Sequence, residues 1–337
     1  MVASSGVRRR FGPNIKVLII TSLLAAASTA GTAQASTQPS ASASASAPSA
    51  GADSAQAAYQ AALKSPDWVR TPEGLENKSC VQTIPAGATF DQPTNSILLA
   101  SGAKEKAAAP CAYPQLTPTG QVPATGASSP AASFSYGWQA YSYWNSPNWL
   151  EGVNSTYTVP SAPSVGGTYD YFFSSLQGAG PSIVQVVLEW DQNQWNVLDE
   201  YNWNGGDKRS PTTIPVAPGD KILTTVLASN CQTNGNCTWS LDGTDERTGQ
   251  SADLSINAGQ SFTQADGGVM ELPQQSGTSV ACDQLPASGS MDFKAITVFG
   301  ATGNPVTPSW SVTHNGNNKG WCGVYVDTSA TETYIPW

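Results

Sequence analysis

Short runs of alternating apolar and polar residues fill the chain from about residue 133 to its end. Gly, Pro and Asn-Gly interrupt these runs, and convincing amphipathic helices are absent. Alternation with a period of two is typical of strands that bury one face. The pattern predicts strands over the following ranges: Phe134–Tyr143, Gly152–Val159, Asp170–Leu176, Ile183–Glu189, Trp195–Asn202, Lys221–Ala228, Thr238–Asp242, Ser251–Ile256, Gly268–Leu272, Met291–Val298, Ser309–His314 and Gly323–Asp327.

Turn signals separate these runs at the spacing of an antiparallel sandwich, as in Ala217-Pro-Gly-Asp220 and Asn257-Ala-Gly-Gln260. The segment Ser133–Trp337 is long enough for one domain with its own core. We therefore predict an all-β fold, an antiparallel two-sheet jelly-roll sandwich. Ten of the eleven Trp residues fall in this segment. Most should pack in the core or at its rim; a row of them on a concave sheet, forming a polymer-binding groove, is the alternative.

Residues 1–35 have the order of an export signal. Arg8-Arg9-Arg10 is basic, residues 17–27 are apolar, and Ala33-Gln34-Ala35 offers small residues for cleavage before Ser36. The apolar run is too short for a bilayer span, and no later segment approaches the roughly 20 apolar residues that a membrane helix needs. We expect a secreted, extracellular protein, exported by the general secretory or the twin-arginine route.

Residues 36–132 are expected to form a low-complexity linker followed by a pro-segment or N-terminal arm. Ser/Ala repeats run to about Ala58 and predict disorder, with one short helical signal near Ala57–Lys64 and an apolar patch at Ile97–Ala100. Up to residue 132 nine Lys and Arg oppose six Asp and Glu, whereas from Ser133 onward six oppose eighteen. A basic front half that covers an acidic body and a plain spacer are the two interpretations.

Six Cys residues, an even number in an exported chain, predict three disulfides. Cys231 and Cys237 bracket Gln-Thr-Asn-Gly-Asn, a natural hairpin tip, which makes this pair the firmest prediction. The remaining four are expected to pair as Cys80–Cys111 and Cys282–Cys322.

Several classes of function are disfavoured by what the sequence lacks. His314, in the turn-like Thr313-His-Asn-Gly316, is the single histidine, and no Cys-x-x-Cys occurs, so we expect no metal and no cofactor. A Gly-rich phosphate loop is also missing, and a net charge of −12 from Ser133 onward disfavours nucleic acid and anionic lipid. We expect a monomer that acts through carboxyl and carboxamide groups.

Gln185 interrupts the otherwise apolar strand Ile183–Glu189. A buried carboxamide needs hydrogen-bond partners, because leaving it unsatisfied costs roughly 1–3 kcal/mol. A structural Gln bound to nearby backbone is one interpretation. A Gln that orients a substrate carbonyl or water and helps form an oxyanion site is the other.

The Gln185 region resembles the catalytic-Gln region of the eqolisins, the glutamic peptidases. The resemblance rests on Phe173-Ser-Ser-Leu-Gln-Gly178, Ile183-Val-Gln-Val-Val-Leu-Glu-Trp190, Asp199-Glu-Tyr-Asn-Trp203, Val216–Val226 and Thr238–Gln250, within roughly Gly152–Val298. It implies a secreted, acid-active endopeptidase with a concanavalin-A-like jelly-roll and a pro-segment. In such an enzyme Gln185 polarises the scissile carbonyl and holds the oxyanion.

The second catalytic residue of the family is the first Glu of Ala-Glu-Trp-Ile-Val-Glu, and Gly267-Gly-Val-Met-Glu-Leu272 stands here. Matching Glu271 to the first Glu gives a dyad with Gln185, in which Glu271 is the base toward water and then the acid toward the leaving amine. Matching Glu271 to the second Glu places Gly267 at the catalytic position. Glu189, on the strand face of Gln185, and Glu200, which resembles a groove-lining acid of the family, are the next candidates. The resemblance implies these substrate-binding residues: Phe173 in place of Trp, Gln177 in place of Asp, Glu189, Trp190, Glu200 and Trp203.

Three functions of different classes remain open. An endopeptidase with a polypeptide substrate predicts Gln185 facing a carboxyl group in an aromatic groove. A carbohydrate-binding or carbohydrate-cleaving jelly-roll predicts exposed coplanar Trp rings, or two facing carboxylates roughly 5–9.5 Å apart. A catalytically inactive structural relative predicts Gln185 buried and saturated by backbone.

Overall fold

The computed structural model describes residues 57–72, 74–117, 120–122, 137–166, 168–178, 182–203, 206–272, 282–314 and 321–337. The chain divides into two compact units, Met1–Ala47 and Pro48–Trp337, and every described residue belongs to the second. Residues 1–56, which include the expected signal segment and all but the end of the Ser/Ala region, lie outside the described residues. Among the described residues, no helix has the length and apolar character to cross a bilayer.

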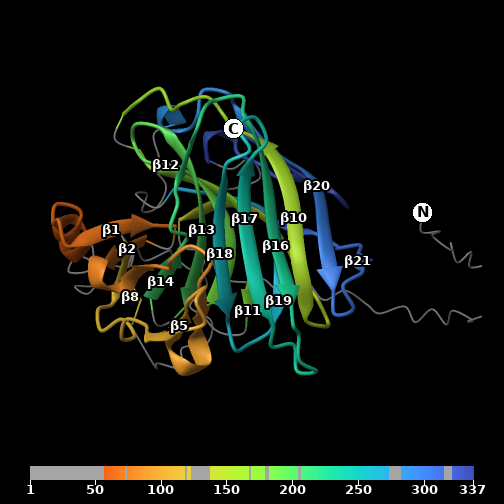
Figure 1. Ribbon diagram of the computed structural model, residues 1–337. Helices are drawn as coiled ribbons and strands as arrows, with labels where there is room; N and C mark the ends of the chain where they lie inside the picture. The colour runs from red at the N-terminus through yellow and green to blue at the C-terminus, as the bar shows by residue number, and fades with distance from the viewer. Residues whose placement is uncertain are drawn as a thin grey trace, which may run out of the picture. The chain divides into compact units, whose positions relative to one another are not determined.

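Two large sheets dominate the fold (Figure 1). The nine-stranded sheet has the order β22 (Ser311–His314), β9 (Trp138–Asn145), β19 (Phe262–Glu271), β11 (Asp170–Gly178), β12 (Ser182–Trp190), β13 (Trp195–Trp203), β14 (Gly206–Arg209) and β3 (Val81–Thr83), with β15 (Ile214–Val216) paired to β13. The eleven-stranded sheet has the order β23 (Asp327–Ser329), β24 (Glu332–Pro336), β20 (Ser290–Gly300), β10 (Leu150–Thr158), β16 (Lys221–Ser229), β17 (Thr238–Asp245), β18 (Ser251–Asn257), β4 (Thr89–Asp91), β5 (Ser96–Leu98) and β6 (Lys104–Lys106), with β21 (Pro305–Val306) paired to β20. Most of these strands come from residues 137–337, which we call the body, and β3, β4, β5 and β6 come from the segment before it.

Apolar side chains of both sheets meet in one core. Val186 and Val197 of the nine-stranded sheet belong to the same buried cluster as Leu241 and Phe293 of the eleven-stranded sheet. The alternation in β12 and β13 places every second side chain in this core and the others on the opposite face. We call that opposite face of the nine-stranded sheet the outer face; it carries a second, smaller apolar cluster.

The all-β prediction is confirmed, and most expected strands have counterparts. The expected strand Gly323–Asp327 is wrong, because residues 321–323 form a 3-10 turn and the strands there are β23 and β24. The short strands β14 and β15 were also missed, because Gly-Asp-Lys-Arg has no apolar alternation.

The segment before the body contributes more structure than a linker or pro-segment pattern suggests. We call residues 57–122 the arm. It begins with a helical turn at residues 57–62 and forms a four-stranded sheet of β1 (Trp68–Thr71), β2 (Gly74–Asn77), β7 (Gln115–Thr117) and β8 (Gly120–Val122). Its strand β3 runs parallel to β14, and its strand β4 runs parallel to β18. All described strand pairs within residues 137–337 are antiparallel, as expected, and the two parallel pairs join arm strands to the body.

The three predicted disulfides are present. Cys231 and Cys237 close the β16–β17 hairpin with their Cα atoms 4.1 Å apart, and Cys80–Cys111 lies within the arm. Cys282–Cys322 joins two 3-10 turns, Cys282–Gln284 and Trp321–Gly323.

Asp199 is a buried acid in the core between the sheets. Its side chain points beneath Gly243 of β17, where an added Cβ would lie 3.3 Å from Asp199 Oδ1. Within the described part of the chain neither carboxyl oxygen has a hydrogen-bond partner. Burial, followed by the charges of Asp242 and Asp253, raises the pKa of Asp199 well above its ordinary value. Burial likewise raises the pKa of Asp170, so the fold favours protonated acids.

We expect Asp199→Asn to flatten the pH dependence of stability. With a raised folded-state pKa, the stability from this group is full below the ordinary Asp pKa of about 4, and it is lost as the pH rises toward the folded-state pKa. Asparagine does not titrate, so the free energy of unfolding of the variant should fall less between about pH 4 and pH 7. Denaturant unfolding at each pH measures this, with the exposed Asp327→Asn as the control. Equal slopes for wild type and Asp199→Asn would contradict the assignment.

Candidate functional site

A row of polar side chains crosses the outer face of the nine-stranded sheet. The strand register pairs Asp266 with Ser175, Ser175 with Gln185, Gln185 with Glu200, and Glu200 with Arg209. Their apolar neighbours along the strands, such as Phe173 and Val187, belong to the outer cluster and not to the core between the sheets. Gln185 therefore faces outward, between two acids on neighbouring strands.

A side chain on the neighbouring strand accepts the hydrogen bond described for Gln185. Its Nε2 donates to Glu200 Oε2 at 2.8 Å. The other Glu200 oxygen accepts from Arg209, with Nη2 at 2.9 Å. Arg209 Nε also donates to Asp207 at 2.6 Å. Because Glu200 is held from its other side by a guanidinium, the amide group of Gln185 has a fixed orientation.

Asp266 occupies the other end of the row. Its Oδ2 accepts hydrogen bonds from Ser175 Oγ at 2.5 Å and Gln177 Nε2 at 2.8 Å, and its Oδ1 accepts one from Gln264 Nε2 at 2.8 Å. Burial raises the pKa of Asp266 to about 6, while the three donors pull the pKa down. The pKa of Asp266 thus lies above the ordinary Asp value. The sequence analysis did not include Asp266 among the candidate catalytic residues.

A β-bulge places Asp266 in the row. The register of β19 shifts by one residue relative to β9 between Asp266 and Gly268, which leaves Gly267 as the extra residue. A Cβ at Gly267 would lie 2.8 Å from Ser142 Oγ, and one at Gly268 would lie 2.4 Å from the ring of Phe293. The Gly-Gly pair was the sequence signal for this bulge.

Glu271 lies in a different row. It pairs with Tyr171, which in turn pairs with Glu189, four residues along β12 from Gln185. Four strand residues correspond to about 13 Å, so Glu271 and Gln185 are not neighbours in this register. Burial and the charge of Glu189 come first among the causes that raise the pKa of Tyr171, and Glu271 and Glu200 add to them. A catalytic role for Glu271 stays a prediction.

The expected substrate-binding residues divide between the two faces of the sheet. Phe173 lies on the outer face, with its ring centroid 5.5 Å from that of Trp138, and Gln177 binds Asp266 there. Glu189 shares the face of Gln185, as expected. Trp190 and Trp203 pack against the core between the sheets instead, because they stand an odd number of residues from the outward positions of their strands.

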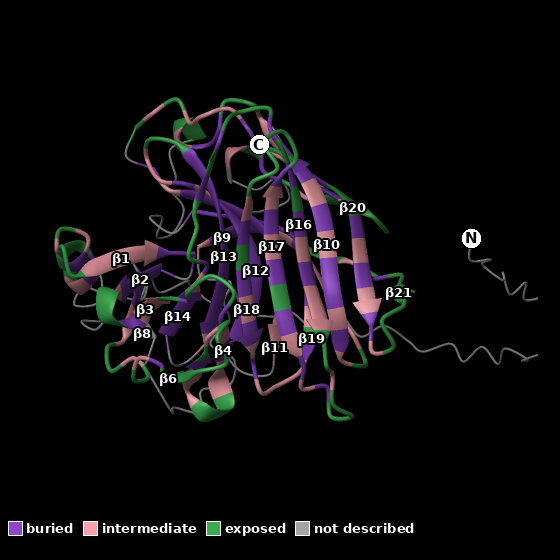
Figure 2. Cartoon of the chain, in the orientation of Figure 1, coloured by how far each residue is buried: buried purple, intermediate pink, exposed green. Residues whose placement is uncertain are grey.

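The arm contacts the outer face beside this row. Asn202 Nδ2 donates to Glu76 Oε1 of β2 at 2.9 Å, and Arg209 Nη2 donates to the carbonyl oxygen of Arg70 at 3.3 Å. At Gly206 the backbone of Cys80 approaches so closely that a Cβ would lie 2.3 Å from its carbonyl oxygen. Gln185, Glu200 and Asp266 are fully buried, and purple dominates these strands in Figure 2.

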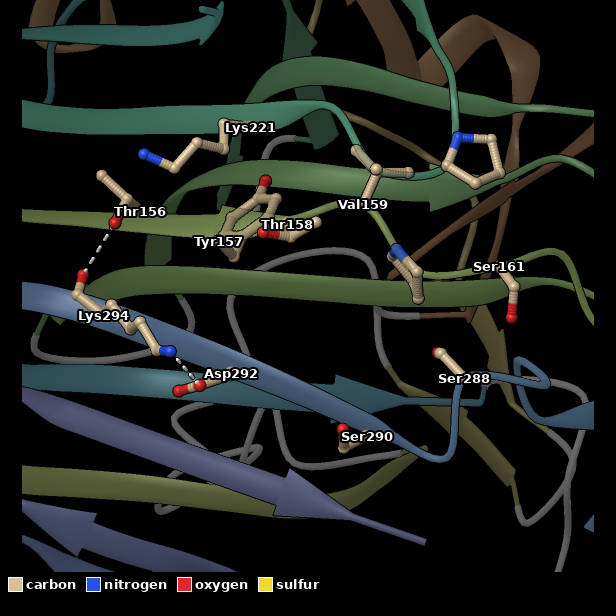
Figure 3. Close-up of a pocket in the computed structure, with 13 residues that line it drawn as sticks. Thr156, Tyr157, Thr158, Val159, Ser161, Lys221, Ser288, Ser290, Asp292 and Lys294 are labelled. Atoms are coloured by element: carbon tan, nitrogen blue, oxygen red, sulfur yellow. Dashed lines mark hydrogen bonds and ion pairs between the residues drawn. The ribbon is translucent and has the colours of Figure 1, made fainter.

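A cavity of about 260 Å³ lies on the eleven-stranded sheet, away from this row (Figure 3). Lys221, Lys294 and several hydroxyl groups line it, and Asp292, the carboxyl group among its described lining residues, is paired with Lys294 at 2.7 Å. It offers no pair of facing carboxylates. None of the Trp side chains that the structure describes is exposed, so a row of exposed indole rings is not seen in that part of the chain.

His314 is the last residue of the edge strand β22, where the predicted strand Ser309–His314 also ends, and the remainder of the turn expected at Thr313–Gly316 lies outside the described residues. Within the described ranges, no three His, Cys, Asp or Glu side chains are grouped so as to hold a metal ion.

Comparison with known proteins finds no matching family model and no matching curated protein. Among solved structures, scytalido-glutamic peptidase with a peptide-based transition-state analogue is 18% identical to this chain, with a TM-score of 0.46. The match covers 60% of this chain and 98% of the peptidase chain. The same peptidase with a transition-state analogue inhibitor, also 18% identical with the same coverage, has a TM-score of 0.44. SCP-B, a member of the eqolisin family in complex with the tripeptide Ala-Ile-His, is 17% identical over the same shares with a TM-score of 0.43. Similarity at this level carries no argument about activity.

We expect Ser175→Ala to raise the pKa of Asp266 above about 6, because one of the donors that stabilise its carboxylate is lost. Titration of the Asp carboxyl carbons by ¹³C NMR measures the shift, with Asp266→Asn to identify the signal. The exposed Ser240→Ala is the control. An unchanged or lowered pKa in Ser175→Ala would show that Ser175 does not hold the carboxylate.

Proposed function

We propose that this protein is a secreted acid endopeptidase of the glutamic type, in which Gln185 and Asp266 form the catalytic pair. The row of Asp266, Ser175, Gln185, Glu200 and Arg209 is the observation that carries the proposal. Peptide hydrolysis needs a base for water, a donor for the oxyanion and an acid for the leaving amine. This row offers a carboxyl group and a fixed carboxamide on one sheet face.

The proposed reaction takes place between the two side chains. Gln185 and Asp266 are two strand spacings apart, roughly 9.6 Å between their backbones, with the short Ser175 side chain in the middle. A water molecule and the scissile carbonyl occupy this space in the proposed reaction. Asp266 accepts a proton from the water, and the water oxygen attacks the carbonyl carbon. Gln185 donates a hydrogen bond to the oxyanion that forms.

The intermediate then breaks down with the same groups. Asp266 gives its proton to the amide nitrogen, the C–N bond breaks, and the carbonyl re-forms. Glu200 and Arg209 act through Gln185 by holding its amide in place, and they are positioning residues. Asp266 thus takes the part that the sequence assigned to Glu271, because the bulge brings it into the row of Gln185.

Burial of Asp266 would keep the full chain inactive in acid, because it raises the pKa of the proposed base. In the covered state, burial holds its pKa near 6, so at acidic pH the carboxyl group is protonated and is a poor base. The hydrogen bonds from Ser175, Gln177 and Gln264 favour the ionised form, so access of water to the carboxyl group would lower its pKa. In the proposed active form Asp266 is exposed to water and ionised in the acidic range where the resemblance places the activity.

We expect Asp266→Asn and Gln185→Ala each to lower kcat/KM on denatured protein by at least about 10²-fold, because the first loses the base and the second the oxyanion donor. Cleavage between about pH 2 and pH 6, followed by mass spectrometry, measures the loss, and circular dichroism confirms folding. Glu271→Gln is the matched comparison. A harmless Asp266→Asn with a damaging Glu271→Gln would return the base to Glu271. No cleavage by processed wild type anywhere in this range would overturn the peptidase assignment.

The arm should keep the full chain latent, and Glu76→Ala should weaken this cover. The change leaves the buried Nδ2 group of Asn202 without its Glu76 acceptor, at a cost of about 1–3 kcal/mol. We expect a higher basal activity of the full chain and a lower melting temperature. Glu105→Ala, an exposed change in β6 of the same arm, is the control. A destabilised Glu76→Ala chain without any gain in activity would show that the arm does not block the site.

A further inference from the structure

A cavity of about 310 Å³ lies where the arm meets the outer face, at Glu189, four residues along β12 from Gln185. Trp68 and Arg70 line it from the arm, and Tyr169 and Glu189 line it from the body. The body thus contributes an aromatic ring and a carboxyl group to one cavity. Both groups attract cations, the ring through its face and the carboxylate through charge.

The side chain of Arg70 already occupies one wall of this cavity. Its guanidinium carbon lies 4.3 Å from the centre of the Tyr169 ring. The same guanidinium makes a hydrogen bond to the hydroxyl of Tyr59, which lowers the pKa of Tyr59 against the stronger effect of burial. The cation is therefore stacked on the body's aromatic ring and held from the side of the arm.

The backbone of Arg70 is bound at the Arg209 end of the row that contains Gln185 and Glu200. Arg209 donates from Nη2 to the carbonyl oxygen of Arg70 at 3.3 Å, and the same Nη2 lies 2.9 Å from Glu200, the acid that binds Gln185. A peptide segment whose carbonyl accepts from Arg209 is therefore linked to Gln185 through Arg209 and Glu200. The arm shows how one extended residue fits beside the row, with its backbone on Arg209 and its side chain over Tyr169.

The charge on the outer face favours a basic side chain at this position. Glu189, Glu200, Glu271 and Asp207 are carboxyl groups of the body near Arg209 and Tyr171, and Arg209 is the body cation among them. When the arm leaves, Arg70 takes its positive charge away and the acids remain. A Lys or Arg side chain from another polypeptide restores both the charge and the stacking.

We infer that Tyr169 and Glu189 form a subsite for a cationic side chain, and that Arg70 occupies it as an internal substitute for a Lys or Arg of the polypeptide substrate. The part of this inference that concerns substrate rests on the proposed peptidase function. Glu189 binds the cationic head and Tyr169 stacks against it. Peptides with a basic residue at this subsite are the preferred substrates.

Binding at the subsite is tested without catalysis. The full-length Arg70→Ala chain is titrated with N-acetyl-arginine methylamide, and its melting temperature is followed, since a ligand of the folded state raises it. We expect an apparent Kd at least about tenfold lower than that for N-acetyl-norleucine methylamide. The double variant Arg70→Ala/Glu189→Gln should lose this difference. Arg70→Met, which keeps the apolar stem, replaces Arg70→Ala if that chain does not fold.

Cleavage tests the substrate preference. Wild type and Glu189→Gln are processed and given peptides that differ only in one Arg, Lys, norleucine or Glu residue. We expect wild type to cleave the Arg and Lys peptides with kcat/KM at least about tenfold above the norleucine peptide, and Glu189→Gln to reduce that ratio.

The two measurements separate the subsite from the proposed function. Selective binding together with basic preference supports the inference. Selective binding without cleavage of any peptide keeps the cation site and removes the peptidase function. Cleavage without basic preference, or equal binding of the arginine and norleucine probes, overturns the subsite while the peptidase function stands.

Discussion

Arg209 ties the buried acids of the outer face to each other and to the arm. It binds Glu200 and Asp207, both fully buried, and donates to the carbonyl oxygen of Arg70. Two buried carboxylates without such a cation would be costly, because breaking a buried pair by removing one partner costs about 3–5 kcal/mol. The orientation of Gln185 depends on Glu200, and Glu200 depends on Arg209. The candidate site, the short strand β14 and the contact with the arm therefore share one cation.

Local sequence patterns predicted most strands of the body and the disulfides. The residues that meet across neighbouring strands depend on the strand register, which those patterns do not give. Alternation was sufficient for most of the β strands of the body, and the even Cys count with a hairpin tip was sufficient for Cys231–Cys237. That Gln185 and Glu189 share one strand face also followed from a period of two. Asp266 was missed because a one-residue bulge at Gly267 changes which residue of β19 reaches the row. Trp190 and Trp203, which the resemblance implies as substrate-binding residues, pack against the core because they stand an odd number of residues from the outward positions of their strands.

The arm shows why net charge alone is a weak guide to a contact. The front half appears basic, but four of its nine Lys and Arg lie in residues 1–35, and from Ser36 to residue 132 five Lys and Arg oppose six Asp and Glu. The contacts that join the arm to the body are specific ones, such as Glu76 with Asn202 and β3 with β14. An attraction between a basic arm and an acidic body is therefore not needed to explain the cover. The positive charge that matters is placed at one residue, Arg70.

Burial of acids gives the fold and the proposed site the same pH dependence. Asp170 and Asp199 are held protonated by desolvation, so the folded state gains from an acidic medium and loses as the pH rises. Asp266 is desolvated too, but its three donors favour the ionised form and pull its pKa down. The described structure gives no such donor to the carboxyl oxygens of Asp170 and Asp199. An acidic medium therefore suits the neutral core acids, whereas the proposed reaction needs Asp266 in the ionised form that its donors favour.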